Sequence, residues 1–182
     1  MFKIYGCFVN ILTSFSVGLL LLLSASFSIA DDEYSSYEVA ELILGIIHFT
    51  RWPDDQNELQ LCILGQTDHA DLLSNNQLAV GKFVVDGRVV EESEVFQQLN
   101  SCQVFFFGKM SLDNTHQLYT QLYSNPVLTI DEMNDACRVG GMFCLHYYDN
   151  KLGFKVNLDA IGRSQVRVHP GVLRLGQRRL SE

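Results

Sequence analysis

Positive charge is scarce in this sequence. Its 182 residues include 13 Lys and Arg against 21 Asp and Glu, which gives a formal net charge of −8. A chain this acidic has no general electrostatic attraction for nucleic acid or for an anionic membrane surface, so we expect no nucleic-acid partner. Any anion-binding site must be a local concentration of basic side chains.

Familiar catalytic motifs are also missing. The sequence has no Gly-x-Ser-x-Gly elbow, no phosphate-binding loop and no His-Glu-x-x-His motif, and its carboxylates are scattered without a distinctive pair. We therefore predict a protein that is not an enzyme, with no catalytic residues, no cofactor and no metal site. Cys137, Cys144 and His146 offer metal ligands, but their spacing fits no common zinc pattern, and a disulfide is the stronger interpretation. His69 begins a polar predicted helix, and we expect it to be solvated.

Charge is almost absent from the first 30 residues. Lys3 is the only charged side chain there, a Leu run fills residues 19–23, and Ser28 and Ala30 place small residues at the end of the segment. This pattern is typical of a signal peptide cleaved after Ala30, with a retained N-terminal anchor as the alternative. No later stretch reaches the ~18 apolar residues of a membrane span. We expect residues 31–182 to be exported as one soluble domain.

Four cysteines remain once the leader is removed, and in an oxidising compartment four thiols normally pair. Three connectivities are possible. We favour Cys62 with Cys102 and Cys137 with Cys144, because the second pair is close in sequence and the first two each border an apolar, strand-like run.

Helical and strand patterns alternate along the exported chain. Helical spacing or capping residues indicate helices at 37–49, 68–76, 93–99 and 111–123, with a helical turn at 157–162. Strand-like runs lie at 59–65, 102–107, 127–130, 142–148, 152–156 and 164–169, and residues 82–91 form a hairpin or kinked strand around Asp86 and Gly87. We predict a single α/β domain, a mixed β-sheet flanked by helices, with a C-terminal antiparallel hairpin.

Two short stretches are candidates for binding. If residues 164–169 form a strand, Gln165, Arg167 and His169 point to one side, which places two potential cations on one face of an acidic protein. Arg51 and Trp52, the only Trp, stand at the end of the first predicted helix. Trp52 fills the core and Arg51 caps helix carbonyls in one interpretation, whereas both contact a ligand or partner in the other. We predict that Arg51, Arg167 and His169 converge.

The motifs, taken in order, resemble those of the YfiR family of periplasmic regulatory proteins over essentially the whole exported chain. The resemblance is carried by Phe-Thr-Arg-Trp-Pro at 49–53, Leu-Cys-Ile-Leu-Gly at 61–65, Cys102 before an apolar strand, Pro-Val-Leu-Thr-Ile at 126–130, Cys137 with Gly-Gly-Met-Phe-Cys at 140–144, and Phe-Lys-Val-Asn-Leu-Asp-Ala at 154–160. Residues 172–176 depart from the more usual family ending, outside these motifs.

The resemblance implies an α/β fold, two intramolecular disulfides and a tendency to form a homodimer. It implies repression of a YfiN-like inner-membrane diguanylate cyclase through its periplasmic region, and sequestration by a YfiB-like outer-membrane lipoprotein, so that cyclic di-GMP and biofilm formation are tuned. It also implies a small ligand near Arg51, Arg167 and His169. Two classes of function stay open: an interaction protein that controls a partner, and a periplasmic module that binds a small anion.

Overall fold

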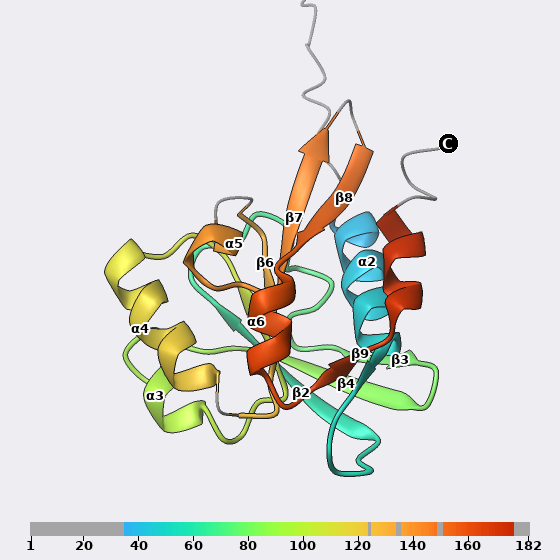
Figure 1. The fold of residues 1–182 in the computed structure, drawn as a ribbon. Helices are drawn as coiled ribbons and strands as arrows, with labels where there is room; N and C mark the ends of the chain where they lie inside the picture. The colour runs from blue at the N-terminus through green and yellow to red at the C-terminus, as the bar shows by residue number, and fades with distance from the viewer. Residues whose placement is uncertain (1–34, 124, 134–135, 149–150, 177–182) are drawn as a thin grey trace, which may run out of the picture. The chain divides into compact units, whose positions relative to one another are not determined.

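The computed structural model of the chain describes residues 35–123, 125–133, 136–148 and 151–176 (Figure 1). The expected signal peptide and its cleavage site after Ala30 lie outside these residues. Within the described ranges, no helix is both long enough and apolar enough to cross a membrane.

The centre of the fold is a seven-stranded mixed sheet in the order β3-β4-β2-β5-β6-β7-β8. The five inner strands run parallel, and the edge strands β3 and β8 are antiparallel to their neighbours (Figure 1). The strands are β2 (Glu58–Leu64), β3 (Gln77–Val80), β4 (Phe83–Val89), β5 (Val104–Phe107), β6 (Leu128–Asp131), β7 (Phe143–Tyr148) and β8 (Lys151–Val156). The predicted α/β fold, its mixed sheet and its C-terminal hairpin are confirmed.

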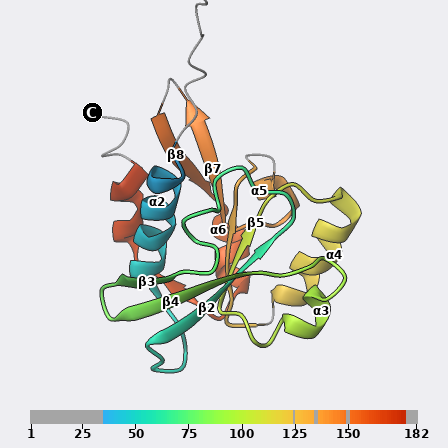
Figure 2. The same cartoon turned by 180° about the vertical axis from the view of Figure 1, so that it is seen from behind.

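Helices cover both faces of the sheet (Figures 1 and 2). On one face lie α2 (Ser36–His48) and α6 (Leu158–Arg163), and on the other α3 (Val95–Gln98) and α4 (Leu112–Leu122), whereas the short α5 (Ala136–Val139) precedes β7. The sequence of strand β5 is apolar throughout because the strand is buried on both faces. Val104 and Phe106 enter the core beneath α2, and Phe105 and Phe107 enter the core beneath α3 and α4.

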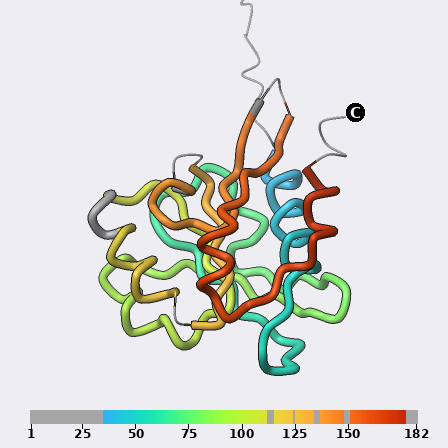
Figure 3. The backbone as a smooth tube through the Cα atoms, viewed as in Figure 1, coloured from blue at the N-terminus to red at the C-terminus, as the bar shows by residue number. Residues whose placement is uncertain are grey.

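Helix α2 has a defined start and end. The Ser35 side chain accepts from the Glu38 amide and the Glu38 carboxylate accepts from the Ser35 amide, which is a capping box. The helix ends at His48 with Phe49 as its C-cap, and Thr50–Arg51 (β1) pairs antiparallel with Arg167–Val168 (β9) in a separate two-stranded sheet. The strand predicted over 164–169 therefore shrinks to β9. After it, the 3₁₀ helix Pro170–Val172 (η1) and residues 173–176 run beside α2 (Figure 3).

The helix predicted over residues 68–76 is wrong, because tertiary contacts override its local pattern. The segment forms bends and turns, and the carboxylate of Glu132 accepts from the amides of Asp68 and His69. At the other end, Asn75 adopts a φ of 55° and donates its amide to the carbonyl of Gly87. These contacts tie the segment to β4 and β6.

Of the two alternatives for residues 82–91, a single strand through Asp86 and Gly87 is confirmed and the hairpin is wrong. Both residues lie inside the continuous strand β4, and the chain reverses between β3 and β4 at residues 81–82. Gly87 is needed for another reason: a Cβ there would overlap the carbonyl of Leu73. The glycine lets the 68–76 segment pack directly on the strand.

Candidate functional site

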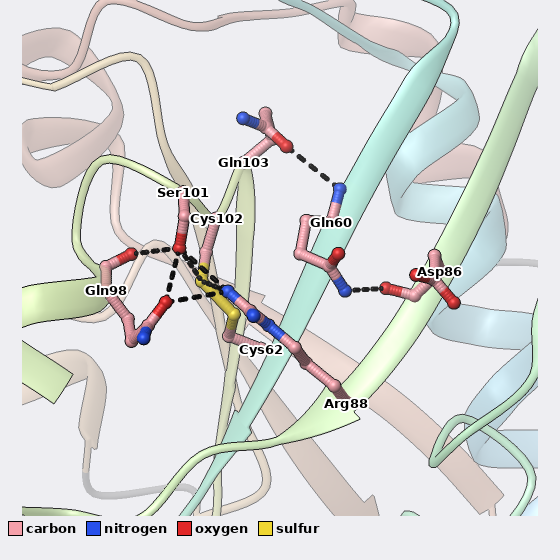
Figure 4. Close-up of a disulfide and its surroundings, with 8 residues drawn as sticks. All are labelled: Gln60, Cys62, Asp86, Arg88, Gln98, Ser101, Cys102 and Gln103. Carbon is pink, nitrogen blue, oxygen red and sulfur yellow. Dashed lines mark hydrogen bonds between the residues drawn. A yellow bond between two sulfur atoms is a disulfide. The ribbon is translucent and has the colours of Figure 1, made fainter. Parts of the chain in front are cut away.

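Two disulfides join the four cysteines of the described chain. Cys62 in β2 is bonded to Cys102, just before β5, with 5.9 Å between their Cα atoms (Figure 4). Cys137 in α5 is bonded to Cys144 in β7, with 5.8 Å between their Cα atoms. This is the pairing that the sequence favours. Because the sulfurs of Cys137 and Cys144 are joined to each other, the alternative metal site with His146 lacks its thiolates.

A groove opens where β1 and β9 meet, which we call the Arg51–Arg167 groove. It has a volume of about 520 Å³ and is lined by Arg51, Trp52, Pro53, Gln165 and Arg167. Arg51 and Arg167 are direct partners in the β1–β9 register, and both are exposed. Direct antiparallel partners project from the same face, so the two guanidinium groups are brought to one surface.

The pairing of two cations gives the groove a distinct electrostatic character. Like charges directly opposite each other on neighbouring strands destabilise the pair. Of the ion pairs found among the described residues, none includes Arg51 or Arg167. An anion placed between the two side chains would remove the repulsion and accept charge-assisted hydrogen bonds.

Arg51 and Trp52 also have structural roles. Arg51 donates from Nη1 to the carbonyls of His48 (2.7 Å) and Thr50 (2.8 Å), so it caps the C-terminus of α2. Trp52 is 8% exposed, and its Nε1 donates to the carbonyl of Gln103 at 3.3 Å. Phe83 joins the two, with its ring 5.5 Å from that of Trp52 and 5.9 Å from the Arg51 guanidinium carbon. Capping and core packing thus hold both side chains in place at the groove.

His169 lies beside the groove and is not part of its lining. Its ring stacks on Phe49 at 6.1 Å, and its Nδ1 accepts from the amide of Gly171 at 3.0 Å. The ring therefore serves as the N-cap of η1, which fixes Nδ1 as an acceptor. Of the three residues expected to converge, the structure brings Arg51 and Arg167 together, with Trp52 beside them, and places His169 two residue pairs further along the ladder, opposite Phe49.

No sequence pattern indicates the buried carboxyl group at the end of β6, which belongs to Asp131. Asp131 is 1% exposed; the hydroxyl of Tyr119 donates to its Oδ1, and its Oδ2 has no hydrogen-bond partner among the described residues. A Cβ on Gly141 would overlap Oδ2, so the chain closes tightly over it. Burial raises the pKa of Asp131 to about 8, against the opposing effect of the Tyr119 hydrogen bond. Asp131 is therefore mostly neutral at pH 7.

The adjacent Glu132 corrects the expectation for His69. The side chain of His69 is 12% exposed, not solvated, and its Nδ1 lies 3.0 Å from the Glu132 carboxylate. Glu132 also accepts from the amides of Asp68 and His69, both at 2.9 Å. One carboxylate thus fastens the loop after β2 to the end of β6. No local sequence pattern could predict the contact between His69 and Glu132, because the two residues lie 63 positions apart.

These features define a disulfide-bonded α/β domain with a small cationic groove beside its main sheet. A family model described as YfiR/HmsC-like matches residues 38–177. The chain therefore belongs to the YfiR/HmsC-like family, as its motifs predicted. Membership indicates a periplasmic regulator of cyclic di-GMP signalling, in a family that is regulatory in character.

Proposed function

We propose that this protein restrains a YfiN-like inner-membrane diguanylate cyclase by binding the periplasmic region of that enzyme, and so lowers cyclic di-GMP and biofilm formation. The observation that supports the proposal is the family match over residues 38–177. A periplasmic regulator acts on a cytoplasmic reaction by biasing a transmembrane partner between two states, and it does so by binding one state more tightly.

Three further features belong to the same proposal. The chain is exported by a signal peptide that is cleaved after Ala30. It acts as a homodimer, and it is released from the cyclase when a YfiB-like outer-membrane lipoprotein sequesters it or when reducing stress opens its disulfides. The last step has a clear energetic basis, because loss of a native disulfide costs a small secreted domain about 2–5 kcal/mol.

The direct test is capture of the detergent-solubilised cyclase by the purified, oxidised protein. We expect capture by the oxidised protein and loss of capture after both disulfides are reduced. In cells, deletion of the gene should raise cyclic di-GMP and surface attachment only where the cyclase is present. A deletion that leaves cyclic di-GMP unchanged while the cyclase is expressed would defeat the proposal.

A second candidate function is a periplasmic module that binds a small anion. It is favoured by the pairing of Arg51 with Arg167 in the groove, where neither has a carboxylate partner within the described residues. Calorimetric titration with a small carboxylate and with inorganic phosphate tests it, with Arg167→Ala as the variant that should lose binding. An anion-binding module alone has no reason to capture the cyclase, so the two experiments separate the candidates.

A further inference from the structure

Trp52 is connected to the first disulfide by a short chain of contacts. Its indole Nε1 donates to the carbonyl of Gln103. Gln103 follows Cys102 directly, and Cys102 is bonded to Cys62 on the neighbouring strand β2. The wall of the Arg51–Arg167 groove is thus one hydrogen bond and one peptide unit away from a covalent cross-link.

Gln103 is fastened to β2 through both its backbone amide and its side chain. Its amide donates to the carbonyl of Gln60 at 3.0 Å, and its Oε1 accepts from the amide of Gln60 at 2.9 Å (Figure 4). On the other side, the carbonyl of Gln103 accepts from the amide of Leu128 at 3.0 Å as well as from Trp52. The position of this carbonyl therefore depends on how the beginning of β5 is held against β2.

The disulfide and a polar cluster hold the segment that leads into β5. Arg88 of β4 donates from Nη2 to Ser101 Oγ at 2.7 Å and to Gln98 Oε1 at 3.0 Å, and the same nitrogen lies 3.7 Å from Cys102 Sγ (Figure 4). Both oxygen acceptors are neutral: Gln98 is the last residue of α3, and Ser101 lies on the turn that follows. Because Cys62 is fully buried, the covalent bond adds to these hydrogen bonds an anchor in the interior of the sheet's second face.

We propose that the Cys62–Cys102 disulfide governs the shape of the Arg51–Arg167 groove by holding Gln103, the acceptor of Trp52. A dithiol supplies two electrons and two protons to open the bond, Cys62 and Cys102 become thiols, and the dithiol leaves as a disulfide. The start of β5 then loses its covalent link to β2, and Trp52 loses a fixed acceptor. The use of this coupling in regulation rests on the second proposed function, in which the groove binds an anion.

The first test uses Trp52 as a built-in reporter, because the chain has only one Trp. The double variant Cys62→Ser/Cys102→Ser is compared with the matched control Cys137→Ser/Cys144→Ser, and far-UV circular dichroism checks that each is folded. We expect the first variant to show a red shift of Trp52 emission and stronger quenching by acrylamide, and the control to show neither. Emission and quenching equal to wild type in a folded first variant would overturn the proposal.

The second test runs the coupling in reverse and needs no cysteine variant. Linkage requires that a contact strengthened by the disulfide also protects the disulfide. Trp52→Phe removes the indole donor, so the equilibrium constant for reduction of Cys62–Cys102 by dithiothreitol should rise by up to about fivefold, the ratio for one net hydrogen bond that is lost completely on reduction. Cys137–Cys144 in the same molecule is the internal control, read by alkylation and mass spectrometry.

An unchanged equilibrium constant for Cys62–Cys102 in Trp52→Phe overturns the proposal, even if the serine variants do not fold. Neither measurement involves the cyclase or an anionic ligand. The coupling can therefore fail while both proposed functions stand, and either proposed function can fail while the coupling holds.

Discussion

Replacing the buried carboxyl group of Asp131 by an amide should change the pH dependence of stability. In Asp131→Asn the side-chain oxygen still accepts from the Tyr119 hydroxyl, and the amide nitrogen takes the place of Oδ2 beside Gly141. Size and shape are preserved, so the main difference is the loss of a titrating group. The substitution therefore isolates the effect of ionisation in the closed space at the end of β6.

The magnitude follows from the two pKa values of Asp131. Burial raises its pKa from 3.8 to about 8 in the folded protein, whereas in the unfolded chain it ionises near 3.8. The stabilising contribution is complete below the unfolded pKa and is lost as the pH rises to the folded pKa, at about 1.4 kcal/mol for each pH unit. The free energy of unfolding of the wild type should thus fall by up to about 5 kcal/mol between pH 4 and pH 8 because of this one group. Asp131→Asn should not show this fall.

Urea unfolding followed by circular dichroism at pH 5, 6, 7 and 8 measures this difference. The free energy of unfolding of Asp131→Asn should exceed that of the wild type by an amount that grows with pH. Asp159→Asn is the control, because Asp159 is an exposed carboxylate paired with Arg163 at the surface. Free energies of Asp131→Asn and wild type that run parallel from pH 5 to pH 8 would refute the assignment of a neutral buried Asp131.

Three more predictions follow from single contacts. Arg167→Glu should raise the free energy of unfolding by about 0.2–1 kcal/mol, because it turns a like-charge pair with Arg51 into an opposite-charge pair, and should abolish anion binding; a fall in stability would contradict this. Glu132→Gln should cost about 1.5–3 kcal/mol by weakening three hydrogen bonds to residues 68–69, with faster proteolysis at that loop as the readout; unchanged cleavage would count against it. Peptide mapping without reductant should find only Cys62–Cys102 and Cys137–Cys144, and loss of the first, which spans 40 residues against 7, should cost more stability.

The regular elements were predictable because their signals are local. Apolar spacing up to Pro53 identifies α2, and continuous apolar runs identify β2 and β5, whose side chains are buried on both faces of the sheet. The helix prediction for residues 68–76 failed because Glu132 and Gly87, both distant in sequence, accept hydrogen bonds from the backbone of this segment. The burial of Asp131 could not be predicted for a similar reason: Asp131 is the last residue of a short strand, and its burial depends on contacts with Tyr119 and Gly141.

The candidate site was predictable only in part. Two basic side chains in an acidic chain suggested Arg51 and Arg167, and the register of β1 with β9 makes them direct partners. That register joins residues more than a hundred positions apart, which no local pattern contains. His169 shared the expected strand face with Arg167, but it caps η1 because Pro170 starts a 3₁₀ turn and leaves the amide of Gly171 in need of an acceptor.

Trp52 gives the two candidate functions a common physical link to the oxidised fold. It belongs to the core beneath α2, whereas Cys62 and Cys102 belong to the core on the opposite face of the sheet, and the backbone of Gln103 is what joins them. If a partner or an anion binds at the Arg51–Arg167 groove, its affinity and the ease of reducing Cys62–Cys102 must be linked by one coupling free energy. If reduction lowers the affinity of the groove by a given factor, binding must lower the equilibrium constant for reduction of the disulfide by the same factor. Saturating the groove with an anion should therefore slow or shift reduction of Cys62–Cys102 and leave Cys137–Cys144 unaffected, because the latter has no part in holding Gln103.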